Sequence, residues 1–304
     1  MRGMTVLTPI GRACGKVILL GEHFVVHGAP ALAAPLLAWE TEVTLLADAT
    51  CIDAPGVSRE DVLEALALAT GAWGRPLPGI RVRSTLPIGA GLGSSAAFAT
   101  ALVRALAQSL PEPVDGEERA RVVHLLEERV HGTPSGLDGA VVGQEALVRF
   151  ERGRSPELVP CAADLCLVVA DSGSPGSTSA EVARVRTFAK QRPDRFEDMV
   201  REASDDVEAG VRALATGDLA LLGARMSAAH ERLRECGVST PALDQLVAAA
   251  LDAGAGGAKL TGAGGGGSIV ALASAEEAEI IAEALAKSGA RHVIVSTLKG
   301  GQTP

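Results

Sequence analysis

Apolar and polar residues alternate along several short segments in the first half of the chain, which is the pattern of half-buried β-strands. Residues 40–47 and 80–86 show this alternation, and residues 17–20 and 24–26 are short apolar runs rich in β-branched residues. Residues 31–35 are small and apolar. We therefore expect the chain to open with several strands of an antiparallel or mixed sheet.

Apolar residues at helical spacing follow these strands. The pattern predicts helices over 58–70, 98–110 and 115–130, with Ser58 as the N-cap of the first. Two short apolar segments come next, and we interpret them as strands at 140–142 and 146–150.

The second half of the chain shows a different order of elements. A buried strand is predicted at 165–170, and helices follow over 177–190, 195–215, 218–236 and 241–253. Strands on both sides of a glycine-rich turn, a helix over 275–287 and a strand over 292–297 complete the chain. This order suits a split β-α-β sheet with helices on one face. Residues 151–160 are polar and contain prolines, so we expect two domains, 1–160 and 161–304.

Composition excludes several classes of protein. The chain has 304 residues, 47% of them hydrophobic and 21% charged, as in ordinary globular proteins. A net charge of −9 argues against nucleic acid or an anionic membrane as a partner. The five cysteines form no C-x-x-C pair, so we expect reduced cysteines and a cytoplasmic protein, and we disfavour Cys161 and Cys166 as a metal pair. No apolar run approaches the length of a membrane span.

One stretch, residues 87–97, reads Pro-Ile-Gly-Ala-Gly-Leu-Gly-Ser-Ser-Ala-Ala between a predicted strand and a predicted helix. Such a loop can present backbone N–H groups and a serine-capped helix start to an anion. On its own, the pattern is equally compatible with a tight turn that binds nothing. It is not a Walker loop, because no Gly-Lys-Ser/Thr follows. It is also a poor dinucleotide-binding fingerprint, because Pro111, Glu112 and Pro113 occupy the region where an acidic strand end is required.

Several polar residues near this loop could carry chemistry. The Ser95 hydroxyl is suited to bind Mg²⁺, with Glu127 or Glu128 as a carboxylate ligand, although both glutamates could instead lie on a solvated helix face. Asp138 follows a loop rich in Gly and Pro and could accept a proton from a hydroxyl, or simply form an Asx turn. Lysines are rare in this chain, yet Lys16 stands beside a glycine motif.

Another rare lysine and the histidines are further candidates. Lys259 also stands beside a glycine motif, which reads Lys-Leu-Thr-Gly-Ala-Gly-Gly-Gly-Gly-Ser over 259–268. The six histidines have no metal-binding spacing. His23 and His131 lie in loops with other candidates, but such residues are more often structural hydrogen-bonding groups than catalysts.

The order and spacing of three motifs resemble the GHMP kinase superfamily. Residues 15–28 read Gly-Lys-Val-Ile-Leu-Leu-Gly-Glu-His-Phe-Val-Val-His-Gly and resemble the first motif. Residues 87–97 resemble the second, the nucleotide-phosphate loop, and residues 259–268 resemble the third. Within the superfamily, the segment from Glu127 to Asp138 is similar to that of mevalonate kinases, as are Gly-Glu-His at 21–23 and Val-Ser at 238–239.

The resemblance implies an α+β protein with the two-domain GHMP kinase fold. Its N-terminal mixed α/β domain would carry a left-handed β-α-β-type phosphate loop, and its C-terminal domain would be a ferredoxin-like split β-α-β domain. The implied activity is ATP-dependent phosphorylation of the 5-hydroxyl of mevalonate with Mg²⁺, a step of isoprenoid precursor synthesis. The implied partners are mevalonate and ATP, without nucleic acid or membrane, and a homodimer is left open.

The resemblance also implies roles for individual residues. Asp138 would be the catalytic carboxylate and Lys16 its cationic partner, and the metal would be bound by Ser95 and Glu127. Further residues would bind the substrate or lie near it: Lys16, Glu22, His23, Asp138, Thr178, Gly262 and Ala263. The phosphate loop would consist of Pro87, Gly89, Ala90, Gly91, Leu92, Gly93, Ser94 and Ser95. Our mechanistic hypothesis is that Lys16 keeps Asp138 ionised while Asp138 orients or deprotonates the hydroxyl.

One departure from the family pattern affects the substrate. Many members place an arginine two residues before the threonine that corresponds to Thr178, and this chain has Gly176 there. The substrate carboxylate would then need another cation, such as Arg184. Alternatives remain a kinase for another small alcohol or for phosphomevalonate, and a nucleotide-binding module without catalysis. The intact Lys16, Ser95, Glu127 and Asp138 argue against that module.

Overall fold

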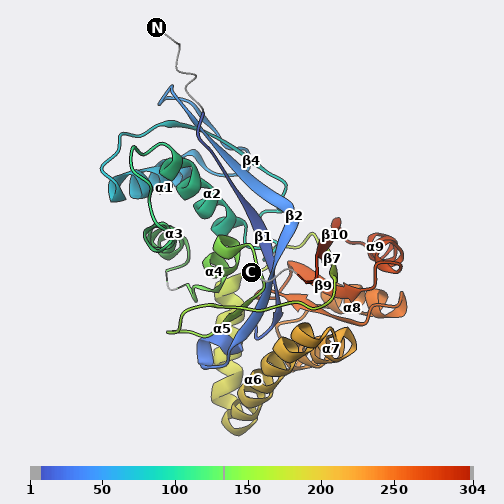
Figure 1. The fold of residues 1–304 in the computed structure, drawn as a ribbon. Helices are drawn as coiled ribbons and strands as arrows, with labels where there is room; N and C mark the ends of the chain where they lie inside the picture. The colour runs from blue at the N-terminus through green and yellow to red at the C-terminus, as the bar shows by residue number, and fades with distance from the viewer. Residues whose placement is uncertain (1–7, 133, 302–304) are drawn as a thin grey trace. The chain divides into compact units, whose positions relative to one another are not determined.

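The computed structural model describes residues 8–132 and 134–301 (Figure 1). The chain forms two compact units, each assembled from separate segments. Unit 1 contains the chain up to Gly15, Trp39–Leu86 and Gly93–Gly143. Unit 2 contains Lys16–Ala38, Pro87–Leu92 and the chain from Gln144 onward.

Both halves of the sequence contain strands and helices. The strands are β1 (Ile10–Leu20), β2 (Ala31–Leu46), β3 (Ile52–Asp53), β4 (Gly79–Ser84), β5 (Val148–Phe150), β6 (Glu157–Leu158), β7 (Leu165–Asp171), β8 (Gly257–Thr261), β9 (Ser268–Ala273) and β10 (His292–Leu298). The helices are η1 (Phe24–His27, a 3₁₀ turn), α1 (Arg59–Ala72), α2 (Ser94–Gln108), α3 (Gly116–His131), α4 (Leu137–Gln144), α5 (Thr178–Gln191), α6 (Pro193–Thr216), α7 (Leu219–Glu235), α8 (Pro241–Asp252) and α9 (Ala278–Lys287).

In unit 1, helices α1, α2 and α3 pack against one another. The C-terminal part of β2 pairs antiparallel with β4, and β3 pairs parallel with β4 through the connection that contains α1. The handedness of this β-α-β connection stays a prediction. The predicted cap of α1 is confirmed, because the Ser58 hydroxyl accepts a hydrogen bond from the Asp61 N–H at 3.0 Å.

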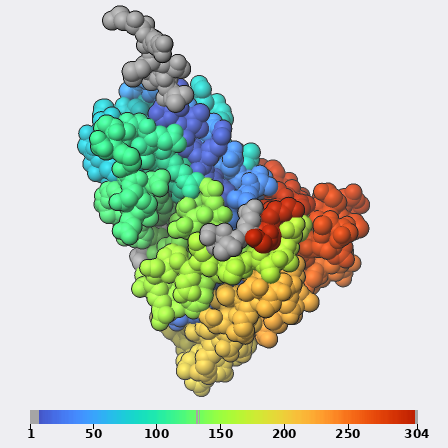
Figure 2. Space-filling model, in the orientation of Figure 1, coloured from blue at the N-terminus to red at the C-terminus, as the bar shows by residue number. Residues whose placement is uncertain are grey.

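In unit 2, the strands β10, β7, β9 and β8 form an antiparallel sheet in that order. This is the order of a split β-α-β sheet and confirms the expected ferredoxin-like arrangement. Alternate strand residues such as Val168 and Ala271 share one buried core with Leu246 of α8 and Leu285 of α9, so helices cover one face of this sheet. Helices α6 and α7 pack along each other and are the yellow and orange elements of Figure 2.

Two sequence interpretations in the first motif region need correction. The run 24–26 is not a strand but the 3₁₀ turn η1. Gly21 at φ 99° and His23 at φ 63° take the backbone out of the extended conformation just before it. The run 31–35 and the predicted strand 40–47, except for its last residue, belong to a single strand, β2. Pro35 is tolerated there because it lies between the part of β2 that pairs with β5 and the part that pairs with β4.

The predicted strand at 140–142 is wrong, because these residues belong to helix α4. Leu137 and Val141 are four residues apart and both are buried, so they line one face of that helix. Burial of this face outweighs the strand preference of two adjacent valines. Helix α2 also begins earlier than predicted, at Ser94 rather than Phe98.

The domain boundary at residue 160 stays a prediction. The contacts within the fold instead divide the chain near Gln144 and assign Lys16–Ala38 and Pro87–Leu92 to the unit that contains the C-terminal half. Within the described residues, no helix combines the length and apolar character that crossing a bilayer requires.

Candidate active site

The first and third sequence motifs meet in unit 2, and the first half of the phosphate loop joins them. The Lys16 N–H in β1 donates to the Leu92 carbonyl oxygen at 2.9 Å. Two residues further along β1, the Ile18 N–H donates to the Thr261 Oγ1 at 2.9 Å. Strand β1 therefore contacts both glycine-rich loops, although the motifs are far apart in the sequence.

The first glycine-rich loop alternates between anchored and open residues. Ala90 and Leu92 are buried, and the Ala90 carbonyl accepts a hydrogen bond from the Ser268 hydroxyl at 3.0 Å. Gly89 and Gly91 are exposed, with φ of 75° and 77°. The loop is thus held from one side while its glycine backbone faces outward, which suits binding of a phosphate by N–H groups.

The second half of this loop starts helix α2 in unit 1. Gly93 is the N-cap, in the left-handed conformation with φ 76°, and no side chain caps the first turn among the described residues. The expected serine cap is therefore wrong, because Ser94 is already inside the helix. An uncapped first turn with its positive dipole end is a favourable place for an anion.

Ser95 and Glu127 lie together in unit 1. The Ser95 hydroxyl donates to the Glu127 Oε1 at 3.0 Å, and Glu127 is buried. Glu128 is half exposed, with its carboxylate 3.4 Å from His124, so it lies on the solvent side of α3. Of the two glutamates, only Glu127 therefore meets the serine, and the two oxygens form the donor set that Mg²⁺ prefers. The described residues contain no group of three or more His, Cys, Asp or Glu side chains that could hold a metal alone.

Asp138 lies in the first turn of α4, in unit 1, and is partly buried. The turn before it is shaped by Gly136 at φ 90° and by the Ser135 hydroxyl, which accepts the Leu137 N–H at 3.2 Å. A carboxylate in the first turn of α4 lies at the positive end of the helix dipole. The His131 side chain, which the sequence placed near it, and Thr133 lie outside the described residues.

The Gly21-Glu22-His23 turn follows β1 and is buried in unit 2. Glu22 forms an ion pair with Lys259, and the Lys259 side chain is fully buried. The Lys259 ammonium also donates to the Leu260 carbonyl at 2.7 Å. His23 Nε2 lies 2.7 Å from the Ala263 carbonyl, which can only accept, so Nε2 carries the proton. The turn is thereby fixed to the strand and loop of the third motif.

Burial sets the protonation tendencies of these groups. It raises the pKa of Glu22 and lowers the pKa of Lys259, while the attraction between the two opposes both shifts. The buried Lys16 is close enough for its charge to act on both groups. Burial also lowers the pKa of His23, so the imidazole is neutral near pH 7. Lys259 was not among the predicted site residues, and its sequence signal was a rare lysine beside a glycine motif.

The structure explains the departure at Gly176. A Cβ atom at this position would collide with the Gly264 carbonyl oxygen, so an arginine does not fit there without a backbone shift. The alternative cation, Arg184, donates to Glu181 at 3.0 Å. Thr178 is exposed at the start of α5, and Ala263 is partly exposed in the second glycine-rich loop.

The predicted site residues fall into two groups, one in each compact unit. Unit 2 contains the following: Lys16, Glu22, His23, Pro87, Gly89, Ala90, Gly91, Leu92, Thr178, Gly262 and Ala263. Unit 1 contains the following: Gly93, Ser94, Ser95, Glu127 and Asp138. Sequence reasoning missed the charge partner of Glu22 and placed a cap on the wrong residue.

Comparisons with known proteins agree with this arrangement of motifs. Residues 59–144 match the family model of the GHMP kinases N-terminal domain, and residues 211–291 match that of the GHMP kinases C-terminal domain. A mevalonate kinase from Thermococcus gammatolerans is 34% identical, with 96% of this chain and 97% of that protein covered. One from Pyrococcus furiosus is also 34% identical, over 96% and 97%. The crystal structure of L. major mevalonate kinase in complex with R-mevalonate superposes with a TM-score of 0.88 at 30% identity, covering 98% of both chains.

Proposed function

The chain belongs to the mevalonate kinase family of the GHMP kinases, and we propose that it transfers the terminal phosphoryl group of ATP to the 5-hydroxyl of mevalonate. The products are 5-phosphomevalonate and ADP. The observation that carries this proposal is the meeting of the motifs in unit 2, where β1 bonds to the phosphate loop through Lys16 and to the third motif through Ile18. The similarity extends over nearly the whole chain and not over one loop.

The phosphates of ATP are bound by the loop that contains Gly89 and Gly91 and by the first turn of α2. The outward backbone of the two glycines and the uncapped N–H groups after Gly93 support this assignment. Pro87, Ala90 and Leu92 shape the loop, and the Ser94 side chain stands beside the phosphates. Binding by N–H groups requires no cationic side chain within the loop.

Mg²⁺ would be held by Ser95 and Glu127, whose oxygens lie 3.0 Å apart. Held there, the ion would supply positive charge that offsets the negative charge of the phosphates. Burial of Glu127 keeps its carboxylate in one position, which a metal site bound largely by phosphates and water requires.

Asp138 orients the substrate hydroxyl and accepts its proton, and Lys16 stabilises the charge that develops on the transferred group. The support for Asp138 is its partly exposed place in the first turn of α4, after the loop that Gly136 shapes. The support for Lys16 is its anchored place beside the phosphate loop. The two residues belong to different compact units, and the pairing of their side chains stays a prediction.

Glu22, His23, Thr178, Gly262 and Ala263 form the mevalonate side of the site. The rigid attachment of His23 to Ala263 supports this assignment, because a pocket that selects one small alcohol needs fixed polar groups. The substrate carboxylate is not bound by an arginine at position 176, since the fold has no room for one there.

A cytoplasmic location stays a prediction, and so does a homodimer. Neither is required for the proposed chemistry.

A substrate panel tests the proposal. Purified protein with ATP and Mg²⁺ should release ADP with mevalonate and at most weakly with phosphomevalonate, homoserine or galactose. A protein without added alcohol is the control for ATP hydrolysis. If another alcohol of the panel is phosphorylated and mevalonate is not, the assignment as a kinase stands and the assignment of mevalonate as its substrate is rejected.

A further inference from the structure

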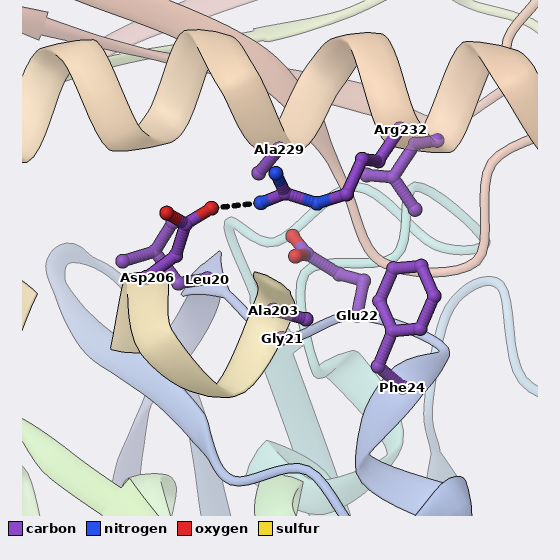
Figure 3. A pocket seen from close by; sticks show the side chains of 9 residues that line it. Leu20, Gly21, Glu22, Phe24, Ala203, Asp206, Ala229 and Arg232 are labelled. Carbon is purple, nitrogen blue, oxygen red and sulfur yellow. Dashed lines mark hydrogen bonds and ion pairs between the residues drawn. The ribbon is translucent and has the colours of Figure 1, made fainter. Parts of the chain in front are cut away.

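A small cavity lies behind the Glu22 carboxylate, inside unit 2 (Figure 3). The volume in which the centre of a water molecule fits is about 10 Å³. This is close to the smallest volume that holds one water. Apolar side chains line most of it, and three charged side chains complete the lining: Glu22, Asp206 of α6 and Arg232 of α7. The cavity is therefore apolar except on the sides where these charges face it.

Two polar atoms of this lining are buried without a hydrogen-bond partner among the described residues. They are Oε2 of Glu22 and Nε of Arg232. The other Glu22 oxygen is bound by Lys259, and the other end of the Arg232 guanidinium is bound by Asp206. Figure 3 shows the Glu22 carboxylate pointing toward the Arg232 side chain. A hydrogen-bond acceptor on Glu22 and a donor on Arg232 thus face one cavity. Each belongs to a side chain whose other polar atoms already form an ion pair.

Leaving two buried charged groups partly unsatisfied is costly, because each polar atom has lost its hydration without gaining a partner in the protein. One water removes this cost, because it accepts from the Arg232 Nε–H and donates one hydrogen to the Glu22 Oε2. Its second hydrogen can turn toward Asp206, which also lines the cavity. Two or three such partners are typical of buried water in proteins.

We propose that one buried water joins the Glu22 carboxylate to the Arg232 guanidinium and that Arg232 thereby positions the Gly21-Glu22-His23 turn. Glu22 is then held by a cation on each side, Lys259 directly and Arg232 through the water. Because the turn bears His23, whose ring reaches Ala263, a shift of Glu22 moves a part of the mevalonate side of the site. Arg232 is a positioning residue, and its effect on substrate binding rests on the proposed function.

Arg225 provides a matched control. Its guanidinium lies 3.3 Å from the same Asp206, but its side chain is 44% exposed and does not line the cavity. Loss of Arg225 removes a cation from Asp206 and leaves the Glu22 side of the network untouched. Any effect that passes through Asp206 should therefore appear in both arginine variants.

A double-mutant cycle tests the positioning role. Arg232→Met should raise the KM for mevalonate about tenfold and leave the KM for ATP within about twofold, while Arg225→Met changes neither beyond about twofold. In a Glu22→Gln background, Arg232→Met should add less than about twofold, because the group on which it acts has lost its charge. The positioning role of Arg232 would be overturned if Arg232→Met raised the KM for mevalonate equally in both backgrounds. It would also be overturned if Arg225→Met raised this KM as much as Arg232→Met does.

A second measurement covers the case in which Arg232→Met does not fold, since it deprives the buried Asp206 of a partner. A high-resolution crystal structure of the unaltered protein should show one water within about 3.2 Å of both Glu22 Oε2 and Arg232 Nε. A cavity without a water, or a direct contact between the two side chains, would overturn the proposal of a bridging water. This result needs no activity, so it is independent of whether mevalonate proves to be the substrate.

Discussion

The two glycine-rich loops look alike in sequence but are built for different tasks. At Gly89 in the first loop, a Cβ atom would find no atom closer than Pro175 Cβ, at 3.8 Å. At Gly266 in the second loop, a Cβ atom would collide with the Ser174 backbone, and φ is 143°. The first loop uses glycine to present its backbone to a ligand, and the second uses glycine to pack the backbone against neighbouring segments.

Within unit 2, the first loop should therefore serve ligand binding and the second loop the stability of the fold. Gly89 is exposed, whereas Gly266 is buried. Side chains near the first loop should therefore affect activity with little effect on folding, and those near the second should do the opposite. Five substitutions and one control variant test this contrast.

The largest effect is expected on the rate of the chemical step. Asp138→Asn should lower kcat by about 10²–10⁴-fold, because the amide cannot accept the proton of the hydroxyl. Stability and ATP binding should remain unchanged, since Asp138 is partly exposed. Steady-state kinetics with a nucleotide-binding control provide the measurement. Turnover near that of the unaltered protein, with ATP binding intact, would refute the assignment.

The largest loss of stability is expected in the second loop. Gly266→Ala should lower the free energy of unfolding by about 3 kcal/mol, because its backbone conformation is open only to glycine and the new Cβ has no space. Gly71→Ala in α1 is the control, since a Cβ there meets nothing within 4 Å and no positive φ is involved. It should be neutral or stabilising by up to about 1 kcal/mol. Equal thermal midpoints for the two variants would contradict the packing role.

Ser95→Ala should affect the metal dependence of the reaction. We expect a loss of roughly 10- to 100-fold in kcat/KM at limiting Mg²⁺, because one oxygen next to Glu127 is removed. Titration of activity with Mg²⁺ should show a higher concentration at half-maximal rate. An unchanged Mg²⁺ dependence would remove Ser95 from the metal site.

Gly89→Ala should act on ATP and only slightly on folding. The side chain has space, so stability should fall by only about 1 kcal/mol, the cost of a left-handed alanine. The KM for ATP should rise about tenfold, because the methyl group stands on the exposed face of the loop. A stability loss as large as that of Gly266→Ala would show that the two loops do not differ.

The smallest effect concerns acid stability beside the second loop. Burial lowers the pKa of His230, whose Nδ1 accepts the Leu260 N–H at 3.4 Å. The unfolded chain therefore binds a proton at higher pH than the folded one. The contribution of His230 is present above about pH 6.5 and is lost as the pH falls below it. Urea unfolding between pH 7.5 and 5.5 should show that the free energy of unfolding falls less steeply with decreasing pH for His230→Gln than for the unaltered protein. An equal pH dependence of the two proteins would contradict the prediction.

Much of the fold could be predicted from local pattern. The cap at Ser58 and the split β-α-β order of the C-terminal half depend on spacing and on turn residues, which a sequence displays directly. Helix α4 was missed because its type is decided by burial of Leu137 and Val141, and a sequence shows valine preference more plainly than burial.

The candidate site could be predicted from the sequence where it depends on local pattern, and the roles of its residues stay predictions. Ser95 stands next to a glycine loop, and this alone indicated a hydroxyl near phosphate. The ion pair of Glu22 with Lys259 joins residues 237 positions apart, and no spacing rule connects them. Arg232 carries no sequence signal at all, because this chain uses arginine freely on its surface and only the fold turns this one toward Glu22.

The proposed function depends most on which oxygen receives the phosphoryl group, and ³¹P NMR of the reaction product measures this directly. With mevalonate, ATP and Mg²⁺, we expect a phosphomonoester signal split into a triplet by the two protons on C5. An unsplit ester signal would place the phosphoryl group on the tertiary 3-hydroxyl. Inorganic phosphate alone would mean that ATP is hydrolysed without transfer, and either result would contradict the proposed function.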